Sequence, residues 1–235
     1  MSRLTPIARM AALVSVVLVA ITVGVGCGSG GPTVVAADSA ARFPSESLRD
    51  WVSYADYVAA YTVVGEREIP PAPEDADHGE GLVGRDVTLR VDRVVWRASG
   101  APALPETIHM TALGWVLVDG ERRELVQHDA PRVAVGEHYV APLARVEDDP
   151  EQPEWWPLGV VAQLPLVDGH IVDSGGWRSA LKSRLASTTL DVLGRDIQAA
   201  EPDPVAAGYR DLRPSQRVKA VVRARNPGPA TTSVP

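Results

Sequence analysis

Short runs of alternating apolar and polar residues dominate the middle of the chain and predict β-strands. The clearest run covers 85–96, where Val87, Leu89 and Val91 face one way and polar residues the other. Comparable runs predict further strands over 57–69, 107–118, 124–127, 133–146 and 156–166. This pattern favours a mainly β structure for 46–176.

Glycine-containing turns separate these strands. Asp119-Gly120 and Asp168-Gly169 are typical of two-residue hairpin turns, and Gly136 is expected in a turn that leads into the strand after it. No helical pattern lies between the strands, so neighbouring strands should pair antiparallel. We expect a small closed or partly open antiparallel β-barrel, with a sandwich as the alternative.

Helical spacing appears at two places outside the strands. Ser45 to Ala55 predicts a short helix capped by Ser45, with Leu48 and Trp51 on its apolar side. After Gly176, leucines recur at helical spacing with a break at 186–189, and 205–209 and 214–225 predict two more helices. The fold class expected is therefore α+β, with a helical segment over 177–225 packed on the barrel and a disordered tail over 226–235.

The N-terminus has the composition of an export signal. Arg3 and Arg9 precede an uncharged, mostly apolar run over 10–25, and Cys27 follows that run closely. We assign 1–27 to a signal or membrane-anchor segment and 28–45, rich in small residues, to a flexible tether. Three outcomes stay open: lipidation at Cys27, an uncleaved anchor that spans the membrane, and cleavage near Val35-Ala36-Ala37. Each places the remaining chain outside the cytoplasm.

The segment that ends in Gly26-Cys27 resembles the lipobox of bacterial lipoproteins. The resemblance implies that Cys27 receives a diacylglycerol and becomes the new N-terminus. The protein would then be anchored in the membrane rather than spanning it. We therefore predict Cys27 as a lipidation site on the extracytoplasmic face of the cell membrane.

Charge narrows the possible partners. From residue 27 onward the chain carries 21 basic and 30 acidic residues, a net charge of −9. Nucleic acid is excluded as an expected partner, because affinity for it comes from neutralising phosphates. The same net charge argues against electrostatic docking on anionic lipid. Cys27 is the only cysteine, so the exported domain must be stable without an internal disulfide.

No motif predicts a catalytic site, a metal site or a cofactor. Asp173-Ser174-Gly175-Gly176 resembles the nucleophile motif of chymotrypsin-like proteases, but no histidine stands in that family's context and the tetrapeptide suits a turn. The acidic run over 75–80 lacks the ligand spacing of a calcium loop. The histidines are dispersed, without the clustering that zinc needs. We expect the protein not to be an enzyme.

The tryptophans give the one candidate binding feature. Trp155 and Trp156 are adjacent, so in a strand they point to opposite faces and one of them would be exposed. An exposed tryptophan can stack on a sugar or hold a partner peptide. Core packing is the alternative for both residues. The partners expected are the membrane, through the N-terminal anchor, and an envelope protein or glycan.

Several segments resemble small uncharacterised exported proteins of high-GC Gram-positive bacteria. They are Asp56-Tyr57-Val58, 88–96, 136–140 and 156–159. The strand pattern is also similar to the OB-like barrel of tissue-inhibitor and netrin-type modules, which normally begin with cysteines that this chain lacks. The resemblance to the exported proteins implies a compact β domain and no known activity. Taken with the N-terminal anchor, we expect a membrane-anchored extracytoplasmic cell-envelope protein that acts as a binding or structural module. The alternatives are a hydrolase of envelope polymers and a protease-inhibitor-like module.

Overall fold

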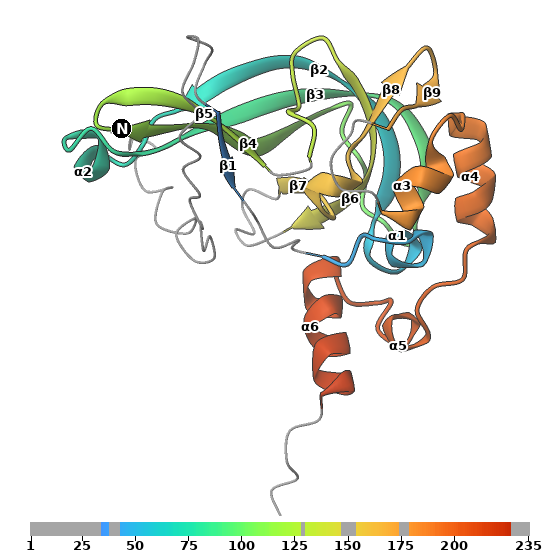
Figure 1. Ribbon diagram of the computed structural model, residues 1–235. Helices are drawn as coiled ribbons and strands as arrows, with labels where there is room; N and C mark the ends of the chain where they lie inside the picture. Colours follow the sequence, from blue (N-terminus) through green and yellow to red (C-terminus); the bar gives the residue numbers. More distant parts are fainter. Residues whose placement is uncertain (1–33, 38–42, 128–129, 147–153, 174–178, 227–235) are drawn as a thin grey trace, which may run out of the picture. The chain divides into compact units, whose positions relative to one another are not determined.

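The structure, a computed structural model, describes residues 34–37, 43–127, 130–146, 154–173 and 179–226. Figure 1 shows the elements in chain order. They are β1 (Val34–Ala37), α1 (Leu48–Tyr54), β2 (Tyr57–Ile69), α2 (Pro73–Ala76), β3 (Gly81–Arg97), β4 (Thr107–Val118), β5 (Glu121–Gln127), β6 (His138–Val146), β7 (Glu154–Pro157), a 3₁₀ turn (Val160–Ala162), β8 (Leu164–Val167), β9 (His170–Ile171), α3 (Ala180–Leu185), α4 (Leu190–Ala199), α5 (Pro204–Ala207) and α6 (Pro214–Arg225).

The strands form one sheet in the order β1-β5-β4-β3-β2-β6-β8-β9, and β7 also pairs with β6. The β2–β6, β4–β5, β6–β7, β6–β8 and β8–β9 pairs are antiparallel, whereas β1 joins β5 in parallel. The prediction of a mainly β fold is confirmed. The sheet is not closed, so a closed barrel is not confirmed.

The chain divides into two compact units, and the long strands β2, β3 and β4 contribute residues to both. Unit 1 consists of Met1–Ala40, Arg67–Asp86 and Thr111–His128. Unit 2 consists of Ala41–Glu66, Val87–Met110 and Asp129–Pro235.

Unit 2 begins with helix α1, which has a strong N-terminal cap. Ser47 accepts a hydrogen bond from the backbone N–H of Asp50, and Asp50 accepts one from the N–H of Ser47 in return. This capping box satisfies two backbone donors that a helix start leaves free. The helix was predicted in the right place, but its cap is Ser47 and not Ser45. Ser45 instead offers its carbonyl oxygen to the indole N–H of Trp51 at 2.9 Å.

The core of unit 2 lies among α1, β2, β6, β8 and the C-terminal helices. Its fully buried members include Trp51, Val58, Val140, Leu185 and Leu193. Strand β6 runs antiparallel to β2 with Tyr57 opposite Leu143 and Thr62 opposite His138. Tyr61 and Tyr139, opposite each other in this pair, stack with their ring centroids 5.9 Å apart. The β2–β6 register therefore fixes both the core and the position of His138.

The C-terminal helices confirm the predicted break at 186–189, since α3 ends at Leu185 and α4 begins at Leu190. Helix α6 covers the predicted 214–225. Its Arg217 donates to the carbonyl oxygens of Ser53, Arg210 and Leu212 at 2.5, 2.9 and 2.8 Å. Burial lowers the pKa of this guanidinium from its usual value. Arg217 thus ties the end of the chain to helix α1.

Unit 1 is a thin sheet with little buried volume. Its described residues with less than a tenth of their surface exposed are Val83, Arg85, Gly114 and Leu125. The β4–β5 hairpin turns at Asp119 and Gly120, with φ angles of 54° and 76°, as the Asp-Gly signal predicts. The guanidinium carbon of Arg122 lies 3.6 Å from the ring centroid of Trp115. Unit 1 is thus held together by surface contacts of this kind, whereas unit 2 is held together by a buried core.

Several predictions need correction or lie outside the described residues. The strand predicted over 156–166 is three elements: β7, the 3₁₀ turn and β8. The range 28–45, predicted as a tether, contains β1, and the segment between β2 and β3 contains the short helix α2. Residues 1–33 with Cys27, Ser174 to Gly176, and 227–235 lie outside the described residues. Among the described residues, no helix is long and apolar enough to cross a membrane.

Candidate functional site

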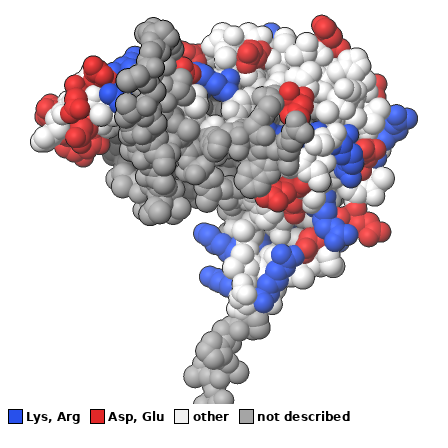
Figure 2. Space-filling view, in the orientation of Figure 1, with Lys and Arg blue, Asp and Glu red and all other residues white. Residues whose placement is uncertain are grey.

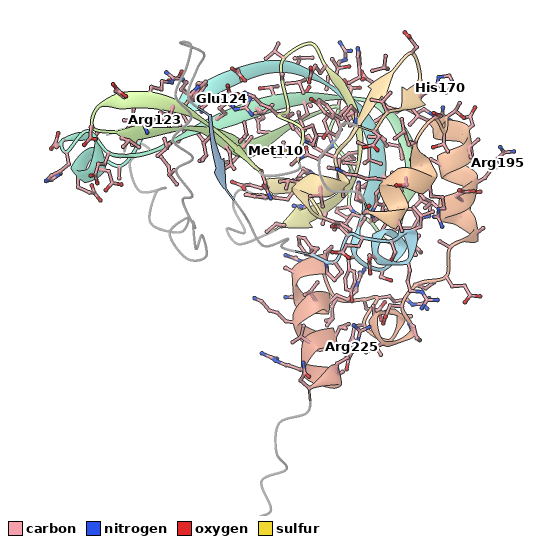
Figure 3. The ribbon with its side chains drawn as sticks, in the orientation of Figure 1. Met110, Arg123, Glu124, His170, Arg195 and Arg225 are labelled. Atoms are coloured by element: carbon pink, nitrogen blue, oxygen red, sulfur yellow. The ribbon has the colours of Figure 1, made fainter. Side chains whose placement is uncertain are left out.

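A half-open groove of about 980 Å³ in unit 2 is the candidate site. It is bounded by β3, by the segment that leads into β6, by the β8–β9 hairpin and by the first residue of α4. In Figure 3 the hairpin can be found by His170 at its β9 end. The residues that line the groove are Ala60, Asp92, Arg93, Pro131, Arg132, Glu137, His138, Tyr139, Pro165, Leu166, Val167, Asp168, Gly169 and Leu190.

The walls of this unit 2 groove are largely apolar. Pro165, Leu166 and Val167 come from the hairpin, and Pro131 and Leu190 from the segments beside it. The hairpin turns at Asp168 and Gly169, whose φ angles of 50° and 77° match the turn predicted there. This turn matters for the site because it carries Val167, a side chain that stays 53% exposed. An exposed valine beside a concave surface is available to a ligand.

Two polar residues that line the groove, Asp92 and His138, meet at the hydroxyl of Thr62, which is not itself part of the lining. Its Oγ1 donates to Asp92 Oδ2 at 2.5 Å and lies 2.8 Å from His138 Nδ1. Arg90 donates to Asp92 Oδ1 at 2.9 Å and to Thr62 Oγ1 at 3.3 Å. Strands β2, β3 and β6 each supply part of this Thr62 cluster, which we define as Thr62, Arg90, Asp92 and His138.

The geometry of the cluster favours one tautomer of a neutral His138 ring, the one with its proton on Nδ1. A hydroxyl has one proton to donate, and that of Thr62 goes to the carboxylate of Asp92. The short contact to Nδ1 is then a hydrogen bond that the imidazole donates, so the neutral ring carries its lone pair on Nε2. Because the side chain of His138 is 57% exposed, Nε2 is an acceptor that a ligand can reach.

Some of the charges around the groove are paired. Arg93 forms an ion pair with Asp191, and that hydrogen bond holds the pKa of the Asp191 carboxyl below its usual value. The Tyr139 hydroxyl donates to Glu137, and Asp92 is paired with Arg90 as described. Because the walls are largely apolar, the groove suits a ligand that is apolar along most of its length.

The predicted aromatic site is not part of the groove. Trp155 is 5% exposed and packs edge-on against Tyr57 with ring centroids 5.7 Å apart. Trp156 is half-buried, and its indole N–H donates to Glu154 at 2.6 Å. They do face opposite ways along β7, and a binding role for either stays a prediction. Cys27, the predicted lipidation site, lies outside the described residues.

The other sequence motifs add no site. In the acidic run over 75–80, Asp75 and Ala76 end the short helix α2, and His78 bonds through Nδ1 to the carbonyl of Glu74. No cluster of metal-ligating side chains occurs within the described ranges. Sequence reasoning missed the Thr62 cluster because its members lie up to 76 residues apart and no local motif joins them. Only the pairing of β2 with β6 could have revealed it.

The chain was compared with protein-family models, with curated proteins and with solved structures. None of the three comparisons finds a match. The resemblances to lipoproteins, to exported envelope proteins and to OB-like modules therefore stay predictions from the sequence.

Proposed function

We propose that this chain is an exported protein, anchored at the outer face of the cell membrane, that binds an extended segment of a partner protein in the unit 2 groove. The observation that carries the binding role is the groove itself, with largely apolar walls and polar side chains such as Asp92 and His138 among its lining. The observation that supports the anchor is the apolar N-terminal run that leads to Cys27. A partly open barrel, the finer form of the fold prediction, belongs to the same proposal.

A peptide fits the groove better than a glycan does. Sugar sites usually offer an exposed aromatic face, and the aromatic residue that lines this groove, Tyr139, is 1% exposed. A peptide in an extended conformation presents alternating side chains and backbone N–H groups. The apolar side chains would contact Leu166 and Val167, and a backbone N–H would donate to Nε2 of His138. The groove volume lies in the usual range for ligand sites.

Binding can be tested on the chain from residue 27 onward with Cys27→Ser. We would titrate it with eight-residue peptides that alternate valine and threonine and, separately, with N-acetylglucosamine oligomers. Chemical shifts of the amides of Val167 and His138 should move with the peptides and not with the sugars. Val167→Glu should abolish the response, and Leu82→Glu, an apolar site of similar exposure in unit 1, should leave it intact. A response to sugar alone would overturn the peptide assignment.

The anchor has a separate test. Cells given a clickable fatty acid should label the wild-type chain and not Cys27→Ser, and only the wild type should stay with the membrane fraction. Equal labelling of both chains, or labelling of neither, would contradict lipidation. Retention of an unlabelled chain in the membrane would instead favour the uncleaved anchor.

A hydrolase is the second candidate, favoured by the hydrogen-bond geometry of the Thr62 cluster. An imidazole whose Nδ1 is held by a hydroxyl that bonds a carboxylate resembles the support of a general base, with Nε2 directed to a water or substrate. Thr62 itself is 8% exposed and its hydroxyl is fully engaged, so it is no nucleophile. Release of soluble fragments from purified cell-wall polymer, lost in His138→Gln, would establish this activity. No release by the wild type would remove it.

A further inference from the structure

The exported chain has a strong internal asymmetry of charge. Residues 27–176 carry 11 basic and 25 acidic residues, a net charge of −14. Residues 177–235 carry 10 basic and 5 acidic residues, a net charge of +5. Helix α6 alone has four cations and no acidic residue. The negative net charge of the whole chain argues against anionic partners. That argument does not apply to α6, whose own net charge is positive.

The cations of α6 divide into two pairs with different surroundings. Arg217 is engaged by backbone carbonyls, and Arg225 forms an ion pair with Asp203. Lys219 and Arg223 are exposed, and neither makes an ion pair within the part of the chain that the structure describes. Figure 2 shows cations as blue groups projecting from α6, and Figure 3 places Arg225 on the same helix.

The exposed face of α6 carries cations and one exposed apolar side chain. Pro214 and Val221 are buried, so the helix packs inward by that side. Lys219 and Arg223 stand one turn apart, and two like charges at this spacing repel each other. The helix dipole favours a cation in the last turn, which accounts for Arg223 but not for Lys219 in the middle of the helix. Val222, 53% exposed, lies next to Arg223.

Helix α6 packs against the first helix that follows the N-terminal segment. Unit 2 begins at Ala41, and the described chain enters it at Phe43, which is buried in the core shortly before α1. Arg217 joins α6 to the end of α1 through the Ser53 carbonyl. The helix thus packs against the part of unit 2 that follows the N-terminal segment most closely in sequence.

We infer that the outer face of α6 docks on the anionic surface of the membrane that holds the anchor, an inference that rests on the proposed location. Lys219 and Arg223 contact lipid phosphates, and Val222, beside them on the exposed side of the helix, enters the headgroup layer. Cations at such a surface attract anionic headgroups within the short range that salt allows. The docking holds unit 2 in one orientation on the membrane, with its groove presented consistently to partners.

The test uses the chain from residue 27 onward with Cys27→Ser, so that no acyl group contributes. Flotation should show binding to vesicles of phosphatidylcholine mixed with phosphatidylglycerol, and none to phosphatidylcholine alone. The double variant Lys219→Glu/Arg223→Glu should weaken the partitioning by at least about 25-fold, since each cation near such a surface contributes about fivefold. Arg184→Glu/Arg195→Glu, which changes the net charge equally at exposed sites of α3 and α4, should change it by less than about threefold.

Each other outcome overturns the inference. Equal binding to both kinds of vesicle removes the electrostatic contact, and an equal loss in both double variants removes the role of α6. Binding of inorganic polyphosphate without vesicle binding, lost in the α6 variant, reassigns the face to a soluble anionic polymer. Because the probe chain carries no lipid, this result is independent of the fatty-acid labelling that tests the anchor.

Discussion

Unit 1 and unit 2 are stabilised by different means. Unit 2 holds an extensive cluster of buried apolar side chains, among them Trp51, Leu185 and Leu193, each with 0% of its surface exposed. Unit 1 has two buried apolar side chains among its described residues, Val83 and Leu125. Strand pairing, glycine packing and exposed ion pairs account for the rest of its contacts. We therefore expect unit 1 to open at lower free energy than unit 2.

This difference also separates two kinds of role. A rigid core suits the groove, whose Thr62 cluster needs three strands held in register. A thin sheet tolerates sequence change, because few of its side chains have packed neighbours on all sides. The four predictions below test this contrast, from the largest expected effect to the smallest.

The largest effect should come from Trp51→Ala. The substitution empties a fully buried position and removes the hydrogen bond to the Ser45 carbonyl, so it should lower the free energy of unfolding by about 3–5 kcal/mol. Urea denaturation followed by circular dichroism measures the change. Trp115→Ala in unit 1, where the ring lies on the sheet surface beneath Arg122, should cost about 1 kcal/mol. Similar losses for the two variants would break the comparison.

Gly114→Val tests whether unit 1 opens by itself. A Cβ at Gly114 would stand 2.5 Å from the carbonyl oxygen of Val83, so the strands must separate, at a cost of about 1–3 kcal/mol. Hydrogen exchange should quicken at Leu125 and remain slow at Val140. As a control, Gly120→Ala meets no atom within 4 Å and costs about 1 kcal/mol through its positive φ alone. Equal acceleration in both units would show that they unfold together.

The buried carboxyl of Asp56 gives unit 2 a pH dependence. It is 7% exposed and accepts the backbone N–H of Arg145 at 2.7 Å, and burial raises its pKa above the usual value. A raised pKa in the folded state means that stability is highest below the unfolded value of about 3.9 and falls as the pH rises through the folded value. Asp56→Asn keeps an acceptor for Arg145 and should remove this decline.

The matched carboxyl for this test is Asp203, whose pKa is lowered by hydrogen bonds from the backbone N–H groups of Ala206 and Val205. Its contribution is present above the unfolded pKa and is lost as the pH falls through the folded one. We would measure unfolding free energies from pH 3 to pH 8 and express each variant relative to the wild type. The relative stability of Asp56→Asn should rise with pH, and that of Asp203→Asn should fall. Parallel curves for the two variants would refute the burial of Asp56.

The smallest effect should be in the ion pairs of unit 1. Arg67 and Asp86 meet at 2.9 Å, but the arginine side chain is 79% exposed. A double-mutant cycle with Arg67→Ala and Asp86→Ala should give a coupling energy below about 1 kcal/mol, because water and salt screen the pair. A coupling of several kcal/mol would mean that unit 1 is held by its charges and is more rigid than its burial indicates.

Local signals predicted much of the fold. Alternation placed β2 over 57–69 and β4 over 107–118, and the Asp-Gly pairs at 119–120 and 168–169 turn as expected. These features depend on neighbouring residues alone. The strand predicted over 156–166 failed because Gly159 precedes a 3₁₀ turn that interrupts an otherwise apolar run. The helix cap moved to Ser47 because only that residue has an acid three positions later to complete the capping box.

The candidate site could not be predicted in the same way. The cluster consists of polar residues within sequence that predicts strands, among them Thr62, Asp92 and His138. Taken singly, each is expected to be a side chain that faces solvent. The register of β2 against β6 brings Thr62 opposite His138, and strand order brings β3 alongside. Register depends on pairs distant in sequence, which one sequence does not display. For the same reason the open sheet could not be distinguished from a closed barrel.

The hydrogen bonds that Ser53 shares with Asp203 and Arg217 also set the order in which unit 2 is completed. They join residues 150 and 164 positions apart, so the contacts of α1 are complete only after α6 has been synthesised and has packed. A ribosome makes the chain from its N-terminus, and closure of such distant contacts is slow. Until α6 has been made, the apolar side of α1 lacks part of its covering. A chain that ends before Arg217 should remain incompletely folded and sensitive to proteases, however well its earlier strands pair.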